Sequence, residues 1–193
     1  MTKRRLIVLG FLVPVLALLS LLAWASITSG GQPGSLGVNN DFGEIEIAKD
    51  AAPQFGLDLF QGGRVELAQL DGMIVFLDFW ASWCAPCRQE APELAEVYRE
   101  YRGRPVEFLG VNIWDDSSAA QDYLIRFDVP YPNGRDADGT VAIDYGVRGI
   151  PEKFFIGPSG SVLKKFVGPI SGADLRQVLD DLLLQHAGEF RAD

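Results

Sequence analysis

The hydrophobic positions divide the chain into an uncharged N-terminal run and a longer part in which polar and apolar positions alternate. Residues 6–27 carry no charge over 22 positions and follow Lys3, Arg4 and Arg5. A helix of this length measures roughly 33 Å, enough to cross a hydrocarbon core of about 30 Å. Because the basic residues come first, the positive-inside rule predicts a cytoplasmic flank at 1–5. We therefore expect a single-pass protein held in the cell membrane by residues 6–27, with its remaining part extracytoplasmic.

A cleaved signal peptide is the alternative interpretation of this run. Ala23-Trp24-Ala25 followed by Ser26 fits a small-x-small cleavage site. The uncharged run is longer than the usual signal-peptide core of about 7–15 residues, which favours an uncleaved anchor. Both interpretations export the rest of the chain.

The pattern after the apolar run predicts a linker and then one α/β domain. Residues 28–52 are rich in Gly, Ser, Asn and Gln and predict a flexible linker, whereas residues 53–187 alternate strand-like and helix-like segments. The predicted strands cover 55–60, 64–67, 73–80, 106–113, 152–156 and 162–167, and the predicted helices cover 85–101, 119–127, 138–145 and 174–186. The first two strands form an N-terminal hairpin, and the whole order predicts a sandwich with a mixed sheet. Residues 188–193 form a C-terminal tail.

Composition and charge exclude two classes of protein. The chain has 17 basic and 26 acidic residues and a net charge of −9, so it offers no basic face for nucleic acid. Its 2 cysteines lie three positions apart, whereas a disulfide-built scaffold needs several at wider spacings. The two cysteines must therefore form one local site.

That site lies where a buried strand gives way to a helix. Cys84 falls at the predicted start of the helix, where free backbone N–H groups and the helix dipole favour a thiolate. Pro86 is compatible with a first helical turn. Cys87 lies one turn further in and is better shielded. The spacing predicts thiol–disulfide exchange, in which an exposed Cys84 attacks and Cys87 resolves the mixed disulfide.

A cysteine pair with this spacing could also serve four purposes besides exchange. A zinc site needs further ligands, and the single histidine, His186, lies about a hundred residues away in the sequence. An inert disulfide would close too short a loop to constrain the unfolded chain much. A thiol peroxidase and a redox-sensing binding module that uses the same pair both stay open.

Two acids near the pair are candidate proton carriers. Asp78 is the only charge in an apolar strand, so we expect its carboxyl to be buried with a raised pKa. Glu90 follows Cys87 by three residues and lies on the same helix face. The alternatives are a hydrogen-bonded core acid for Asp78 and a solvated surface charge for Glu90.

Several segments together resemble a known family. The sequence Trp-Ala-Ser-Trp-Cys-Ala-Pro-Cys at 80–87 resembles the active-site signature of the thioredoxin superfamily. The segments 52–55 (Ala-Pro-Gln-Phe), 70–72 (Leu-Asp-Gly) and 146–152 (Gly-Val-Arg-Gly-Ile-Pro-Glu) resemble its TlpA/DsbE-like branch of membrane-anchored extracytoplasmic proteins. The resemblance implies a three-layer thioredoxin-like sandwich.

The resemblance also implies roles for individual residues. Asp78 matches the buried aspartate of general thioredoxins, and Glu90 matches an acid of the cytochrome-maturation branch, so both join Cys84 and Cys87 as implied catalytic residues. Pro151 matches a cis-proline that faces the redox pair. The residues with an implied substrate-binding role are Trp83, Ala85, Pro86, Ile150 and Pro151. For Trp83 an ordinary surface aromatic residue is the alternative.

The implied partners follow from the branch. The redox-active disulfide Cys84–Cys87 would be the only redox group, with no separate cofactor or metal. Clients would be exported protein disulfides or dithiols, apocytochrome c among them, and a membrane electron donor would re-reduce the pair. Reduction is the first hypothesis, and oxidation stays open because the direction depends on a reduction potential. Lys153 and Gly157 stand where the branch often has Thr and Asp, which leaves client preference open.

Overall fold

The computed structural model describes residues 12–21, 24, 38–39, 43–45 and 50–190. The chain divides into two compact units, residues 1–36 and 37–193. In the first unit, residues 12–21 and 24 are helical. No helix within these described ranges is both long enough and apolar enough to span a bilayer. Much of the predicted anchor and linker, and the whole predicted cytoplasmic flank, lie outside the described residues.

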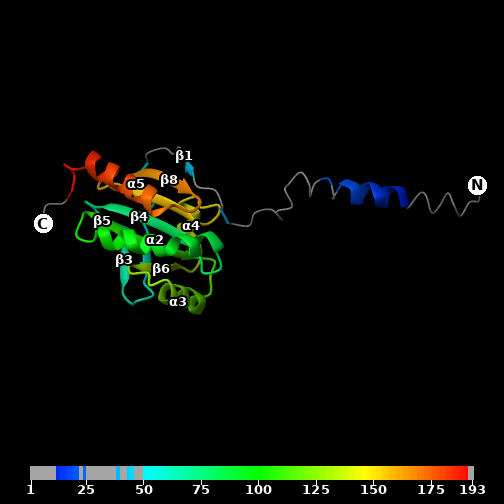
Figure 1. Ribbon diagram of the computed structural model, residues 1–193, viewed down its shortest axis with the longest axis horizontal. Coiled ribbons are helices and arrows are strands. Elements are labelled where there is room, and N and C mark those ends of the chain that lie inside the picture. Colours follow the sequence, from blue (N-terminus) through cyan, green and yellow to red (C-terminus); the bar gives the residue numbers. More distant parts are fainter. Residues whose placement is uncertain (1–11, 22–23, 25–37, 40–42, 46–49, 191–193) are drawn as a thin grey trace, which may run out of the picture. The chain divides into compact units, whose positions relative to one another are not determined.

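The second unit is built on a mixed sheet of six strands in the order β1-β8-β7-β4-β5-β6 (Figure 1). The central strand β4 pairs with β5 in parallel and with β7 antiparallel. The strands are β1 (Gly43–Ile45), β4 (Ile74–Trp80), β5 (Val106–Ile113), β6 (Asn133–Asp136), β7 (Glu152–Ile156) and β8 (Val162–Val167). The predicted α/β class and the mixed central sheet are thus confirmed.

The helices begin where side chains can bind their free N–H groups. They are α2 (Ala85–Tyr101), α3 (Ser117–Arg126), α4 (Thr140–Asp144) and α5 (Gly172–Gln185), with a short 3-10 turn η1 at Leu67–Leu70. Asp116 accepts hydrogen bonds from two N–H groups in the first turn of α3, and Ser171 caps α5 by accepting one from Asp174. These caps explain why α3 and α5 each begin two residues before their predicted starts.

Alternation along β4 divides the core between the two faces of the sheet. Ile74 and Phe76 belong to a cluster with residues of α2 and α5, whereas Leu77 and Phe79 belong to another that includes Val141 of α4. Every residue of β4 is buried, as its dense apolar run predicts for a central strand. Helices therefore cover both faces, and the strand that leads into the cysteine pair lies at the centre of the domain.

Two strands of the sheet have no counterpart among the predicted elements. β6 has the sequence Asn-Gly-Arg-Asp, which carries no apolar alternation, yet it pairs in parallel with β5. β1 lies within the predicted linker and pairs antiparallel with β8. Both are short edge strands whose pairing is set by a neighbouring strand. The stretch predicted as a hairpin contains β2 (Gly56–Asp58) and β3 (Arg64–Glu66), which pair antiparallel as a separate sheet.

Candidate redox site

The two cysteines form a disulfide at the N-terminus of α2. Cys84 and Cys87 have an S–S distance of 2.07 Å and a Cα–Cα distance of 5.3 Å. Cys84 is the N-cap residue, and its sulfur accepts a hydrogen bond from the Cys87 N–H at 3.2 Å. A sulfur held among the free N–H groups of a helix start is favoured as an anion. The local geometry therefore suits a thiolate at Cys84 when the disulfide opens.

The expected exposure of Cys84 is wrong for this disulfide form. Cys84 is 0% exposed and Cys87 is 1% exposed. The cap interaction turns the Cys84 sulfur into the first helical turn, and the disulfide ties it to the buried Cys87. Trp83 and Ala85 on either side of Cys84 are exposed, whereas Pro86 is buried. The surface that solvent reaches beside the cysteine pair therefore belongs to Trp83 and Ala85.

Hydrogen bonds fix the loop that carries Trp83. Its indole Nε1 donates to the backbone oxygen of Trp114 at 2.9 Å, and the residue is 42% exposed. Asp115 accepts from both the backbone N–H and the hydroxyl of Ser82, and from the Asn112 side chain at 2.9 Å. The sequence around Asp115 predicts only the start of a helix. Its contact with Ser82 could not be predicted, because it joins segments that are far apart in the chain.

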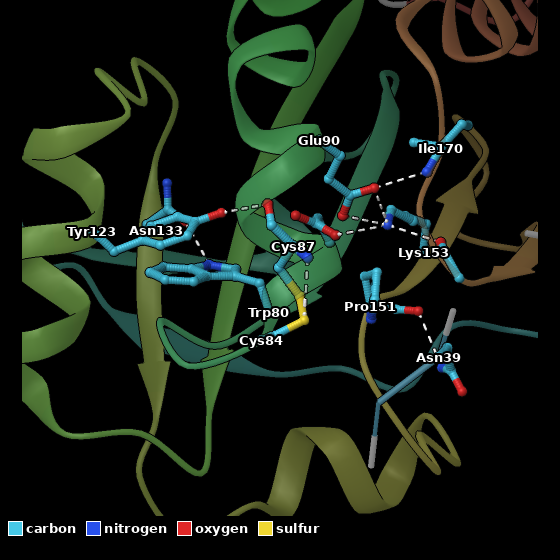
Figure 2. A network of polar contacts seen from close by, with 12 residues as sticks. Asn39, Trp80, Cys84, Cys87, Glu90, Tyr123, Asn133, Pro151, Lys153 and Ile170 are labelled. Atoms are coloured by element: carbon cyan, nitrogen blue, oxygen red, sulfur yellow. Dashed lines mark hydrogen bonds and ion pairs between the residues drawn. A yellow bond between two sulfur atoms is a disulfide. The ribbon is translucent and has the colours of Figure 1, made fainter. Parts of the chain in front are cut away.

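The Ile150–Pro151 peptide bond is cis, in agreement with the family resemblance. Both residues are buried, and Ile150 belongs to the same core cluster as Cys84 and Cys87. The short described segment Val38–Asn39 runs beside this loop. Val38 forms a parallel bridge with Ile150, and the Asn39 N–H donates to the Ile150 oxygen at 2.6 Å. The Asn39 side chain donates to the Pro151 oxygen at 3.2 Å (Figure 2). The loop thus offers its backbone to an extended segment.

A buried charge cluster lies beside the cysteine helix. Asp78, Glu90 and Lys153 are 3%, 4% and 0% exposed. The Lys153 ammonium donates to both oxygens of Glu90, at 2.6 and 2.7 Å, and to the Gly168 oxygen at 3.1 Å (Figure 2). Glu90 also accepts the Ile170 N–H at 2.8 Å. Asp78 Oδ1 lies 3.7 Å from the ammonium. The alternative of Glu90 as a solvated surface charge is therefore wrong.

Burial dominates the acidity of both carboxyl groups. It raises the pKa of Asp78, against the opposing effect of Lys153. It also raises the pKa of Glu90 to about 7, because desolvation outweighs the attraction of Lys153. Lys153 stood out in the sequence only as a departure from the family pattern. Its position opposite Asp78 in the β4–β7 register is what makes it a member of the cluster.

Glu90 should make the stability of the protein depend on pH. Its pKa rises from 4.5 to about 7, so the folded protein binds this proton more tightly than the unfolded chain. The stabilisation is therefore complete below the unfolded pKa and is lost as the pH rises through about 7. We expect about 2.5 kcal/mol more stability from this group at a pH of about 5 than at about 8, measured by urea unfolding. Glu90→Gln should remove that difference, and an unchanged pH slope in this variant would contradict the assignment.

A second polar network supports the cysteine helix from the other side. Trp80 donates its indole N–H to the Asn133 oxygen at 2.8 Å and stacks on Tyr123, with ring centroids 4.2 Å apart (Figure 2). The Tyr123 hydroxyl donates to the Cys87 oxygen at 2.9 Å. A Cβ on Gly110 would collide with the Asn133 side-chain oxygen, so this position requires glycine. The role of Asn133 could not be predicted, since it lies on the unpredicted strand β6. That of Tyr123 depends on the contact between α3 and α2, which local pattern does not reveal.

Comparisons with known proteins agree with this geometry. Residues 48–165 match the AhpC/TSA family. The thiol-disulfide oxidoreductase ResA of Bacillus subtilis is 36% identical over 120 residues, covering 62% of this chain and 67% of the relative. The thiol:disulfide interchange protein HelX of Rhodobacter capsulatus is 37% identical over 114 residues, covering 58% of this chain and 62% of the relative.

Solved structures agree as well. A thiol:disulfide interchange protein of the thioredoxin family from Chlorobium tepidum is 28% identical, with a TM-score of 0.64, and the match covers 72% of this chain and 99% of that one. A secreted Mycobacterium tuberculosis disulfide oxidoreductase, described as homologous to DsbE of E. coli, is 28% identical with a TM-score of 0.61. That match covers 67% of this chain and 96% of that one.

Proposed function

Because the chain belongs to the AhpC/TSA family of thioredoxin-like proteins and is a thiol–disulfide oxidoreductase with its redox pair at Cys84–Cys87, we propose that it reduces disulfides of exported proteins. The Cys84 thiolate attacks a client disulfide, so that one client sulfur leaves as a thiolate and the other stays bound to Cys84. Cys87 then attacks Cys84, the pair closes as a disulfide, and the second client thiol is released. The observation that carries the proposal is the Cys84–Cys87 disulfide capped onto the start of α2.

The division of labour between the two cysteines rests on their places in the helix. Cys84 is the N-cap residue, where unpaired N–H groups stabilise a negative sulfur. Cys87 lies inside the first turn, and its backbone oxygen is held by the Tyr123 hydroxyl. A thiolate at the helix start and a thiol held one turn further in are what attack and resolution require.

Clients would bind along the Ile150–Pro151 loop. The contacts made there by Val38 and Asn39 support this, because an extended backbone already pairs with the loop in this structure. Main-chain hydrogen bonds of this kind bind extended segments with little regard to sequence. Trp83, Ala85 and Pro86 would form the rest of the client-binding surface around Cys84. Asp78 and Glu90 would handle the protons of the exchange.

The proposed location is the outer side of the cell membrane. Residues 6–27 would form a single-pass anchor after the basic flank at 1–5, residues 28–52 would form the linker, and residues 53–187 would form the exported redox domain. The secreted relative from M. tuberculosis supports export. A membrane electron donor would re-reduce the pair. The resemblance to the cytochrome-maturation branch supports apocytochrome c as one client.

The reduction potential of the Cys84–Cys87 pair tests the direction of electron flow. Equilibration with glutathione at defined ratios, followed by alkylation of free thiols and mass spectrometry, measures it. We expect a potential near −270 mV, the value typical of thioredoxin and of a reductant. A potential near −120 mV would mark an oxidant and overturn the proposed direction. Cys87→Ser, which cannot form the intramolecular disulfide, is the matched control.

A further inference from the structure

A proline separates the turn that carries the cysteines from the rest of α2. Pro92 lies inside the helix and has no N–H group. In a regular helix the N–H of residue 92 would donate to the oxygen of Arg88, four residues before it. Because that donor is missing, the turn of Cys87 is held less firmly by its own helix. Its position therefore depends more on contacts that side chains supply.

Side chains and the Cys84 sulfur supply such contacts to this turn. The Tyr123 hydroxyl donates to the Cys87 oxygen at 2.9 Å (Figure 2). Arg88 Nη1 donates to the Ser82 oxygen at 2.8 Å, and the Cys87 N–H donates to the Cys84 sulfur at 3.2 Å. The contacts of Ser82 and Cys84 are local in the chain. That of Tyr123 comes from α3 and ties the turn to a different helix.

The Tyr123 ring is itself held in place. Tyr123 is 7% exposed, and its ring stacks on Trp80 with centroids 4.2 Å apart and an interplanar angle of 23°. On α3 it also packs against Phe127, with centroids 4.8 Å apart. The Trp80 indole is fixed in turn by its hydrogen bond to Asn133 at 2.8 Å. A hydroxyl on a ring packed in this way can direct its hydrogen bond to one place without a further loss of side-chain freedom.

The hydroxyl of Tyr123 is the donor in its contact with Cys87, because a carbonyl oxygen can only accept. Burial has the largest effect on this phenol and raises its pKa above the ordinary value. The hydroxyl therefore keeps its proton at neutral pH and well above it. The contact is thus constant over that range, and its effect on the cysteine pair is one of position.

We infer that Tyr123 is a positioning residue for the resolving step, which holds the Cys87 turn where its sulfur can reach Cys84. The inference rests on the proposed function and concerns its second step. There the Cys87 sulfur loses its proton and bonds to Cys84, and the bond between Cys84 and the client sulfur breaks. The electron pair of that bond leaves on the client sulfur, which takes up a proton and departs as a thiol. The closed disulfide of this structure is the product.

Position governs this step because both sulfurs belong to one chain. The rate of an intramolecular attack depends on how well the two groups are held in a reactive geometry. Without the Tyr123 hydroxyl the Cys87 turn gains freedom in the dithiol form, and closure of the disulfide must remove that freedom. The loss of one neutral hydrogen bond corresponds to about 3–10-fold in an equilibrium constant. We therefore expect the effective concentration of Cys87 at Cys84 to fall by that factor.

Tyr123→Phe tests the inference, because it removes the hydroxyl and keeps the ring that stacks on Trp80. Pre-reduced protein is mixed with oxidised glutathione, and acid-quenched samples are followed by mass spectrometry. The appearance of the glutathione mixed disulfide measures attack by Cys84, and its disappearance measures resolution by Cys87. Tyr123→Phe should slow the disappearance by about 3–10-fold and leave the appearance unchanged. The same loss should make the reduction potential of the pair less negative by about 15–30 mV.

Tyr101→Phe is the matched control. Tyr101 lies at the other end of α2, and its hydroxyl donates to Asp180 at 2.9 Å. Its removal also takes a hydroxyl from a contact with this helix, so it should leave both rates and the potential unchanged. Resolution at the wild-type rate in Tyr123→Phe, or an equal slowing in Tyr101→Phe, would overturn the inference.

Carbonyl labelling of cysteine with carbon-13 gives a readout of the contact itself. The chain has 2 cysteines, so the labelled protein gives two carbonyl signals in the NMR spectrum. In Tyr123→Phe the Cys87 signal should move upfield, because its oxygen loses a hydrogen bond, while the Cys84 signal changes little. An unmoved Cys87 signal would contradict the inference. This result does not depend on exchange with a client. Failure of the proposed function would show instead as a wild-type mixed disulfide that Cys87 does not resolve.

Discussion

Serine in place of Cys84 is expected to reduce turnover of disulfide substrates to the rate seen without protein. A hydroxyl is hardly ionised near neutral pH, so the N–H groups at the start of α2 would have no anion to stabilise. Cys87 remains in this variant, but it lies within the helical turn and is 1% exposed in the disulfide form. The measurement is reduction of a disulfide-bonded test protein by the pre-reduced domain, followed by the appearance of free thiols.

Cys87→Ser is the matched control for that experiment. It keeps the attacking thiolate, so the first bond exchange should proceed at close to the wild-type rate while resolution and turnover are lost. The two substitutions are isosteric and lie three residues apart, so a difference in folding would not readily account for different kinetics. A first bond exchange that stays fast in Cys84→Ser and is lost in Cys87→Ser would show that the roles of the two cysteines are reversed.

Alanine in place of Phe76 is expected to reduce the free energy of unfolding by about 3–5 kcal/mol. Phe76 is 0% exposed on the central strand β4. Its ring lies 4.8 Å from that of Phe108 on β5 and 5.2 Å from that of Phe155 on β7, measured between centroids. Truncation would leave a cavity between three strands that have little freedom to move together. Urea unfolding at a fixed pH measures the loss.

The control for Phe76→Ala is a truncation on the surface. Ile125 on α3 is 79% exposed, so Ile125→Ala should change the free energy of unfolding by no more than about 0.5 kcal/mol. A loss below about 1 kcal/mol in Phe76→Ala would contradict the description of β4 as the centre of the core.

The regular elements around the cysteine pair could be predicted because local pattern and tertiary context agree there. The observed bounds of α2, β5, β7 and β8 coincide with the predicted ranges. Each has a continuous apolar run or face, and turn residues mark the ends. The sequence Asn-Gly-Arg-Asp of β6 has neither signal, and its strand conformation depends on pairing with β5. Short polar edge strands of this kind cannot be detected from alternation alone.

The charge cluster could be predicted only in part. An isolated acid in an apolar strand was enough to single out Asp78 as buried, whereas Glu90 could equally have been a surface charge. The ion pair with Lys153 is what makes Glu90 a buried acid rather than a surface charge. That contact depends on the β4–β7 register and on the position of α2 over the sheet. Likewise the burial of Cys84 depends on a side-chain cap, which spacing along the chain does not reveal.

The central claim is that Cys84 attacks the client and Cys87 resolves the intermediate. The most direct test is to mix each pre-reduced single-cysteine variant with the same disulfide-bonded test protein and to detect covalent adducts on non-reducing gels and by mass spectrometry. We expect Cys87→Ser to accumulate an adduct linked through Cys84, which dithiothreitol releases, and Cys84→Ser to form none on the same timescale. Absence of an adduct in Cys87→Ser, or faster adduct formation through Cys87 in Cys84→Ser, would contradict the claim.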